Sequence, residues 1–248
     1  CFDPDAKRFD GLDAWTMVFV NGRHAPSLSR MNDLPKGLQV LDLRGALEKQ
    51  GTLLEKHFNQ QVDMGEDAFS ALNTAGFEDI AVIIVDREAT PDKPIHLLNI
   101  TTAADGATAS HARCLIVADD GSEVTVLEEH TSIGGTDYFV NALTEIVIGM
   151  NAQVTHYFIE REDRSAINIS TLKAHQARDS RLRSHTVLLG AGLSRNNVNP
   201  VLDGENCHSL LNGVYVGNGD QHQDNLMRVV HAQPHCQSRQ FYKGIMTD

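Results

Sequence analysis

Short runs of aliphatic and β-branched residues dominate the chain from residue 80 onward, separated by turns that contain Gly, Asp, Asn or Ser. Many of these runs alternate between apolar and polar positions. In the segment 154–159, Val154, His156 and Phe158 share one face of an extended chain, so that face can be buried while the other meets water. The pattern predicts ten strands with hardly a helix between them: Ile80–Val85, Ile95–Ile100, Leu115–Ala118, Val124–Leu127, Leu143–Ile148, Val154–Ile159, Ala166–Leu172, His185–Leu189, Ser209–Val216 and Met227–Val230.

The first eighty residues follow a more irregular pattern. A β-like run covers Trp15–Asn21 and continues into Gly22, and the dipeptide Asn-Gly is a strong turn signal. Between Gly45 and Phe77, apolar residues recur at three- and four-residue spacing, which predicts one or two amphipathic helices. Asp67 lies where a carboxylate complements the dipole at the start of a helix.

Three all-β architectures are compatible with the strand pattern: a sandwich, a jelly roll, or a solenoid whose coils stack strand on strand. Strand starts recur at roughly 10 residues, or about 20 if two or more strands make a coil, which is at the short end of solenoid periods. Because an irregular solenoid often has no repeated motif, the periodicity favours a jelly roll and a β-helix equally. In either case we expect a mixed α/β N-terminal domain, residues 1–90, and an all-β core, residues 91–248.

Composition narrows the classes of function. The chain has 248 residues, is 41% hydrophobic, which is enough for a sizeable core, and carries a formal net charge of −12. Nucleic-acid binding depends on a concentrated basic surface, so this acidic balance argues against a nucleic-acid partner. No apolar run approaches the roughly 20 residues that a membrane-spanning helix needs, and we therefore expect no membrane insertion.

The four cysteines, Cys1, Cys114, Cys207 and Cys236, are widely spaced and form no CxxC pair. This spacing argues against a zinc-binding framework and against a disulfide-rich secreted scaffold, so a reducing, cytoplasmic compartment is expected. The chain begins with cysteine rather than methionine and lacks the basic-then-apolar layout of a signal peptide. We interpret it as a truncated or partly ordered chain.

The densest group of polar residues lies in the segment 217–225. If this segment is extended, Asp220, His222 and Asp224 point to one side, because strand side chains alternate with a period of two. Carboxylate and imidazole ligands on one face suit a metal such as iron or manganese. The alternative interpretation is a solvated turn in which His222 is merely hydrogen-bonded.

A second polar group follows at His231, His235 and Cys236, which supply ligand types for a metal or a reactive thiolate. Pro234 disfavours a continuous helix, so the two histidines are not a helical metal pair. Core packing is the alternative role for the cysteine. We hypothesise that these two groups provide transient iron ligands: His222, Asp224, His231, His235 and Cys236.

Other motifs argue against common catalytic machinery. The segment Gly190–Ser194 matches neither a GxSxG nucleophile elbow nor a GxGxxG phosphate loop, and is interpreted as a turn. No GxxxxGK[ST] motif occurs, so nucleotide hydrolysis would belong to another polypeptide. Glu128, Glu129 and His130 are consecutive residues that would point to alternate faces of a strand, and are interpreted mainly as a charged group at a strand end.

The residues of both halves of the chain resemble those of a known family. The order and spacing of motifs over nearly the whole chain is similar to the SufB/SufD family of iron–sulfur cluster assembly proteins, and the ending Ser-Arg-Gln-x-x-Lys is more similar to SufD than to SufB. In the C-terminal half the resemblance rests on Arg195-Asn196, Leu211–Tyr215, Gln221–Asp224, His231, Pro234, Cys236–Gln240 and Lys243-Gly244. In the N-terminal half it rests on Val18–Gly22, Ser27–Ser29, Ala71–Ala75 and the stretch from His111 to Glu128.

The resemblance implies a right-handed parallel β-helix core preceded by a smaller N-terminal domain, which decides between the architectures that periodicity left open. Stacked coils bury a continuous interior that no single coil can bury alone. The exposed strand edge at the end of such a solenoid is a natural interface for a heterodimer.

The resemblance also implies a noncatalytic scaffold subunit of a SufBCD-type complex. In this family SufD pairs with SufB, each binds a copy of the ATPase SufC through a C-terminal helical region, and SufD is linked to iron acquisition. Family members continue past the position of Asp248, so we expect a truncation before that helical region. The family's Cys-Ser-His segment for cluster assembly has no counterpart here.

Two functional hypotheses follow from the sequence. The first is the scaffold, with a SufB-like paralogue and a SufC-like ATPase as partners, transient iron or an Fe–S cluster in the complex, and a homodimer when isolated. The second is a stand-alone metal-dependent enzyme that uses His222, Asp224 and His231 around an activated water.

Overall fold

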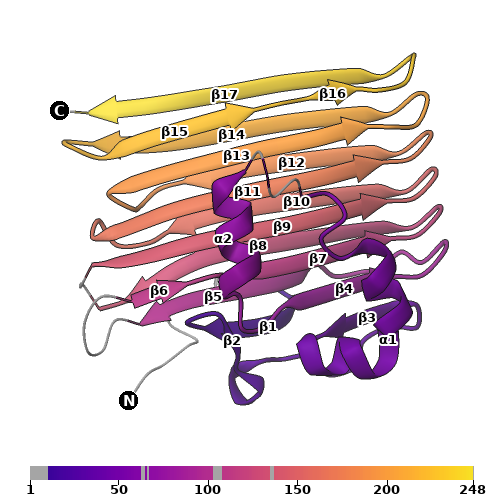
Figure 1. Cartoon of the computed structure of the whole chain (residues 1–248), viewed down its shortest axis with the longest axis horizontal. Coiled ribbons are helices and arrows are strands. Elements are labelled where there is room, and N and C mark those ends of the chain that lie inside the picture. The colour runs from indigo at the N-terminus through magenta and orange to yellow at the C-terminus, as the bar shows by residue number, and fades with distance from the viewer. Residues whose placement is uncertain (1–10, 63–64, 66, 103–107, 135–136, 248) are drawn as a thin grey trace.

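The computed structural model describes residues 11–62, 65, 67–102, 108–134 and 137–247. The chain is 55% strand and 12% helix, and it winds into a parallel β-solenoid of about six turns (Figure 1). The predicted β-helix is thus confirmed, and the jelly roll is excluded because its strands run antiparallel. No described helix is long and apolar enough to cross a membrane.

Two sheets form the walls of the solenoid, and each turn contributes strands to both. In spatial order, sheet A contains β17 (Gln237–Thr247), β14 (His208–Asn218), β12 (Arg181–Leu188), β10 (Gln153–Arg161), β8 (Glu123–Ile133), β5 (Ile95–Thr102), β1 (Trp15–Val20) and β2 (Arg23–His24). Sheet B contains β15 (His222–Met227), β13 (Leu193–Leu202), β11 (Ala166–Gln176), β9 (Tyr138–Ile148), β7 (Arg113–Ala118), β4 (Ala81–Val85) and β3 (Leu38–Leu41), with β6 (Thr108–Ser110) paired to β9 and β16 (Val230–His231) paired to β13.

The register gives the length of a turn. Glu123, Gln153, Arg181, His208 and Gln237 are partners on successive strands of sheet A, so one turn takes roughly 30 residues. The expected period of about 20 residues is therefore too short. It is too short because most core strands extend to 8–11 residues by including polar positions that the hydrophobic pattern excludes.

The N-terminal region confirms the local predictions. Strands β1 and β2 form a hairpin through Asn21 (φ 50°) and Gly22 (φ 78°), both in the left-handed region that a tight hairpin turn requires. A short 3-10 helix, η2 (Pro26–Leu28), follows this hairpin. Asp42 and Asp67 cap α1 (Leu43–His57) and α2 (Ala68–Gly76) by accepting a hydrogen bond from the backbone three residues on.

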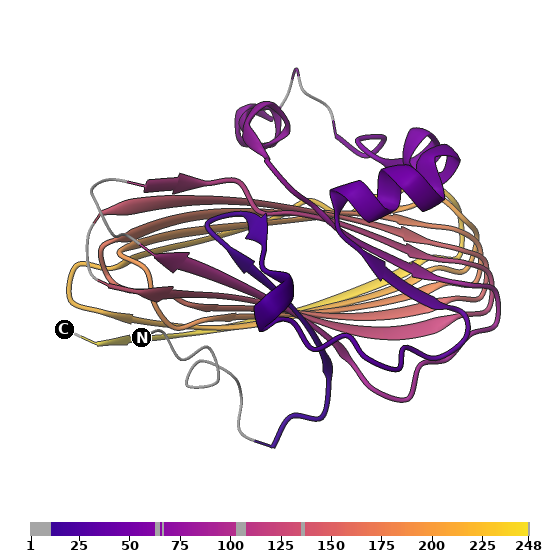
Figure 2. The same ribbon diagram turned by 90° about the horizontal axis from the view of Figure 1, so that it is seen from below.

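The helices lie on one side of the solenoid, against the outer face of sheet B (Figure 2). Buried Asn73 docks α2 on this face, because its amide donates hydrogen bonds to the carbonyl oxygens of Ala112 (2.8 Å) and Asn141 (2.7 Å). Strands β1, β3 and β4 before residue 90 belong to the same two sheets as the strands after it. The sheets therefore continue across the expected domain boundary.

Several segments differ from the predicted strands. Strands β3, β6, β13 and β17 are missing from the prediction, and the predicted strand Met227–Val230 falls on the break between β15 and β16. The cause is visible in β13, where Asn196, Asn197 and Pro200 interrupt the apolar pattern although the strand pairs along its length with β11. Ladder pairing with both neighbours overrides the weak intrinsic strand preference of these residues.

Candidate functional site

The solenoid interior is apolar over one part and polar over the other. Along β10, Val154, His156, Phe158 and Glu160 alternate with more exposed residues and are all buried. The apolar part includes Val124, Ile146 and Leu172. The polar part consists of inward-facing side chains of β8 to β13 and adjoining turns: Glu128, His130, Thr144, His156, Glu160, Glu162, Asn168, Ser170, Ser184, Thr186, Ser194 and Asn196.

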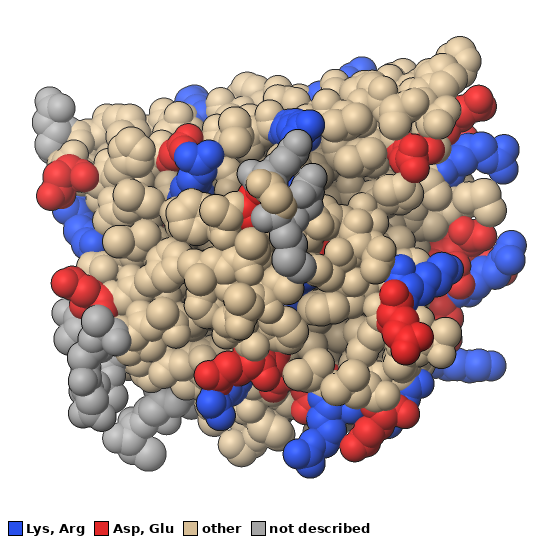
Figure 3. Space-filling model, in the orientation of Figure 1, with Lys and Arg blue, Asp and Glu red and all other residues tan. Residues whose placement is uncertain are grey.

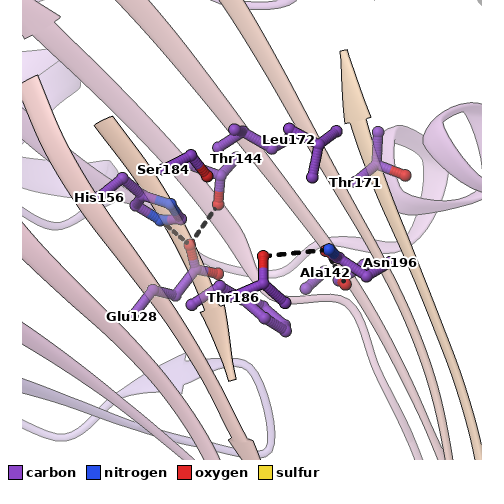
Figure 4. Close-up of a pocket in the computed structure, with 12 residues that line it drawn as sticks. Glu128, Ala142, Thr144, His156, Thr171, Leu172, Ser184, Thr186 and Asn196 are labelled. Carbon is purple, nitrogen blue, oxygen red and sulfur yellow. Dashed lines mark hydrogen bonds and ion pairs between the residues drawn. The ribbon is translucent and has the colours of Figure 1, made fainter. Parts of the chain in front are cut away.

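Glu128 is the centre of this polar interior (Figure 4). Its two carboxylate oxygens lie 3.1 Å from Nε2 of His130 and 3.0 Å from Nε2 of His156, and the hydroxyl of Thr144 donates to it at 2.6 Å. Burial acts to raise the pKa of Glu128, but hydrogen bonds and charge from the two imidazoles outweigh it and hold the pKa far below its usual range. Burial acts to lower the pKa of His130, yet Glu128 raises it overall.

A small hollow of about 10 Å³ adjoins Glu128 and His156. Its far wall is a hydrogen-bonded row: Ser170 donates to the side-chain oxygen of Asn196 (3.1 Å), and the amide of Asn196 donates to Thr186 (3.2 Å; Figure 4). A volume of this size accommodates about one water molecule. The hollow therefore excludes any organic substrate from the cluster.

Glu160 and Glu162 form the second acidic group of the interior. Glu160 accepts hydrogen bonds from the backbone N–H of Glu162 (2.6 Å) and of Gly190 (3.3 Å), and Glu162 accepts from the amide of Asn168 (2.6 Å). Burial, with the charge of Glu162, raises the pKa of Glu160 to about 8, and burial also raises the pKa of Glu162. At neutral pH Glu160 thus retains its proton, and the interior combines a neutral acid with the ionised Glu128.

Gly190 shapes the turn that holds Glu160. A Cβ atom on this residue would lie 2.1 Å from the carbonyl oxygen of Glu162 and 2.7 Å from Oε1 of Glu160. We expect Gly190→Ala to displace this turn and to lower the free energy of unfolding by about 2 kcal/mol. The change is measured as a lower midpoint of urea unfolding. Gly51→Ala, whose Cβ meets nothing within 4 Å, is the control and should leave the midpoint unchanged or raise it. Equal midpoints for Gly190→Ala and the wild type would contradict this account.

The interpretation of Glu128, Glu129 and His130 as a strand-end charge group is wrong. All three are buried within the eleven-residue strand β8, because the turns above and below pair with it along most of its length. The alternation of faces holds: Glu128 and His130 face the interior, whereas Glu129 faces outward and contacts His96 (2.9 Å) and Arg161.

Another buried ion pair fastens the helical region to sheet B. Arg113 on β7 and Glu145 on β9 pair with side chains that are 0% exposed. Glu145 also accepts hydrogen bonds from the backbone N–H groups of Asn59 (2.9 Å) and Gln61 (3.2 Å), which follow α1. This pair therefore ties the connection between the two helices to the solenoid wall.

The structure places the five hypothesised iron ligands in two regions. His222 and Asp224 lie on the outer face of β15, where Asp224 pairs with Arg195 (3.1 Å). His231, His235 and Cys236 lie at β16 and the turn that leads to β17, at the opposite end of that coil (Figure 1). Among the described residues, no three His, Cys, Asp or Glu side chains meet in a way that could hold a metal ion.

The local contacts of the second region are those of a turn. Nε2 of His231 lies 3.0 Å from the hydroxyl of Ser238, and the thiol of Cys236 donates to the carbonyl oxygen of Gly204 (3.2 Å). Cys114, Cys207 and Cys236 are all free thiols. Burial raises the pKa of Cys114 well above its usual value, so this thiol acts in packing rather than in reactivity.

Sequence reasoning missed the interior cluster as a site, although one signal for it was present. The alternation in β10 places His156 on the same face as Val154 and Phe158. A titratable residue on an apolar face needs a buried partner. Its partner Glu128 lies one solenoid turn earlier in the sequence, and only the register of the turns brings the two together.

Comparison with known proteins agrees with this architecture. The family model described as "SUF system FeS cluster assembly, SufBD core domain" matches residues 99–248, and "SufBD protein N-terminal region" matches residues 8–97. The iron–sulfur cluster assembly SufBD family protein of Synechocystis sp. is 32% identical over 94% of this chain and 53% of its own length. The iron–sulfur cluster assembly protein SufD of Escherichia coli is 27% identical, over 96% and 54% respectively.

SufD of Bacillus subtilis is 26% identical over 86% of this chain and 49% of its own length. The chain thus spans about half the length of these curated relatives. The two family models together cover nearly all of it, and the junction between them falls within β5. The chain therefore belongs to the SufBD family of the SUF system for iron–sulfur cluster assembly.

Proposed function

We propose that this chain is a noncatalytic scaffold subunit of a cytoplasmic SufBCD-type complex, in which it pairs with a SufB-like paralogue and a SufC-like ATPase. The observation that carries the proposal is the family match along nearly the whole chain, together with relatives named SufD. The SufBD family as a whole has a role in Fe–S cluster assembly.

One feature of the fold supports a scaffold role. The titratable cluster inside the solenoid adjoins a hollow of about 10 Å³, which is too small for a substrate.

Co-expression of the complete gene product with its SufB-like and SufC-like partners tests this proposal. We expect affinity purification to yield a stable complex in a fixed ratio that contains the ATPase. Recovery of this protein alone, under conditions in which the two partners copurify with each other, would overturn the proposal.

We further propose that this subunit contributes to iron acquisition through transient contacts, with the exposed turn that carries His231, His235 and Cys236 as the contact point and His222 and Asp224 as a second one. The turn is exposed, and the described residues form no closed cage for a metal ion. Both features favour the transfer of iron over its storage. Iron loading of the purified complex is the measurement. A His231→Ala/Cys236→Ser variant is expected to load iron more slowly than a Cys114→Ala control. Equal rates would contradict the assignment.

A further inference from the structure

A group of arginines lies on the outer face of sheet A, away from the interior cluster. The family match assigns these arginines no role. We call the group the arginine patch, and it consists of Arg181, Arg183, His208, Leu210, Gln237 and Arg239, which line a shallow hollow of about 310 Å³. The three arginines are exposed. The patch spans three adjacent strands, since Arg181 pairs with His208 and then Gln237, and Arg183 with Leu210 and then Arg239.

The charge of this patch contrasts with its surroundings. The chain as a whole carries a formal net charge of −12. On the face seen in Figure 3, basic and acidic side chains mix along the edge where the turns lie. Among the described residues, by contrast, none of the three patch arginines forms an ion pair with a carboxylate. Basic side chains of the larger hollow over sheet B do form such pairs, Lys173 with Asp67 and Arg195 with Asp224.

Within the described part of the chain, no helix covers the outer face of sheet A at these strands. Both α1 and α2 lie on the opposite side of the solenoid (Figure 2). Three guanidinium groups close together repel one another, and fold stability gains nothing from their proximity. An anionic partner that neutralises them would convert this repulsion into charge-assisted hydrogen bonds.

We propose that the arginine patch docks an extended, carboxylate-rich segment of a partner protein. Arg181 and Arg183 lie two residues apart on one strand face, which separates them by about 7 Å. Acidic residues at alternate positions of an extended segment have the same spacing, so each carboxylate can meet one guanidinium in a bidentate pair. Arg239, two strands away, receives a further carboxylate, and Leu210 provides an apolar floor between them.

The hydrogen bonding of the backbone at the arginine patch favours several carboxylates over a single phosphate group as the ligand. Strands β12 and β14 are paired on both sides, so their backbone N–H groups are used in the sheet ladder. A phosphate-binding loop instead presents several free N–H groups that converge on one anion. Separate guanidinium groups spaced along a flat face match separate carboxylates.

Fluorescence anisotropy with a labelled eight-residue peptide of alternating Glu and Val tests the proposal on the whole chain. We expect binding that weakens with salt, and an Arg181→Glu/Arg183→Glu variant that binds at least about tenfold more weakly. Arg44→Glu, an exposed arginine on α1, makes the same kind of charge change on the other face and is expected to stay within about twofold. Arg183→Ala/Arg239→Ala, a milder change, serves if the first variant does not fold.

Four results would overturn this proposal. If the wild type and the patch variants bind the peptide with equal affinity, or if the wild type does not bind it, the patch is not the docking surface. Equal affinity for a peptide with Gln in place of Glu shows that charge is not recognised. Displacement of the peptide by millimolar inorganic phosphate, with phosphate protecting the same arginines, reassigns the patch to a phosphate ligand.

Discussion

Replacing Glu160 with glutamine is expected to flatten the dependence of folding stability on pH and to make the protein more stable than the wild type at pH 8. Glu160 is buried, and its pKa rises to about 8 because of burial and the charge of Glu162. Glutamine has nearly the shape of the protonated acid, and its oxygen can accept the hydrogen bond from the backbone N–H of Glu162. Its NH2 group replaces the oxygen that accepts the longer hydrogen bond from Gly190.

The sign of this pH dependence follows from proton binding to Glu160 in the folded and the unfolded protein. Below pH 4.5 both the folded and the unfolded protein hold the proton at Glu160, and the residue adds no pH dependence. Between pH 4.5 and about 8 the unfolded chain loses this proton whereas the folded chain keeps it, so the free energy of unfolding decreases as pH rises. The decrease is on the order of 5 kcal/mol over this window, and above it the contribution stays constant.

Neighbouring groups reinforce this slope at neutral pH and oppose it in acid. The raised pKa of His130 stabilises the fold below the ordinary histidine value of 6.5, and that contribution is lost as pH rises through the folded pKa. Glu128 has a lowered pKa, so its contribution is present above the ordinary value of 4.5 and disappears in strong acid. We therefore expect maximal stability in mildly acidic solution.

Urea unfolding at pH 5, 6, 7 and 8 provides the measurement. The wild type should lose stability steadily over this series, and Glu160→Gln should lose much less. Glu48→Gln, on the exposed surface of α1, is the control and should reproduce the wild-type slope. A Glu160→Gln slope equal to that of the wild type would show that Glu160 ionises normally in the fold.

Removing the charge of Glu145 is the second change with a large expected effect. Glu145→Gln leaves Arg113 charged, buried and without its ionic partner, and breaking a buried pair in this way costs about 3–5 kcal/mol. The carboxylate also holds the backbone after α1, so the helical region should loosen first. Chemical denaturation measures the stability loss, and amide hydrogen exchange of residues 43–76 locates it.

The double variant Arg113→Met/Glu145→Leu shows whether the stability loss in Glu145→Gln comes from the unpaired charge of Arg113 or from altered packing. Replacing both charges with apolar side chains of similar volume removes the desolvation cost of two ions, so stability should recover part of the loss seen in Glu145→Gln. The recovery is partial because leucine cannot accept the hydrogen bonds from the backbone N–H groups of Asn59 and Gln61. Arg113 also contacts the ring of Phe58, and the methionine retains an apolar contact there. A double variant that is less stable than Glu145→Gln would contradict the account.

Much of the local structure was predictable from residue patterns. The alternation of faces in 154–159 places the correct side chains inside, because a strand has a period of two whatever its neighbours are. Asn21-Gly22 predicts its hairpin because glycine and asparagine accept a positive φ, and Asp67 predicts the start of α2 because its carboxylate caps free N–H groups. These features depend on a few adjacent residues.

The turn length, the strands β13 and β17 and the interior cluster depended on tertiary structure. Pairing between positions one full turn apart supplies hydrogen bonds and burial that no local pattern contains. The same pairing brings Glu128 to His156 and separates His222 from His231, although the latter two are closer in sequence. The sequence by itself therefore determined the faces and caps, whereas the stacking of the turns decided which polar residues meet, because contacts between turns join residues distant along the chain.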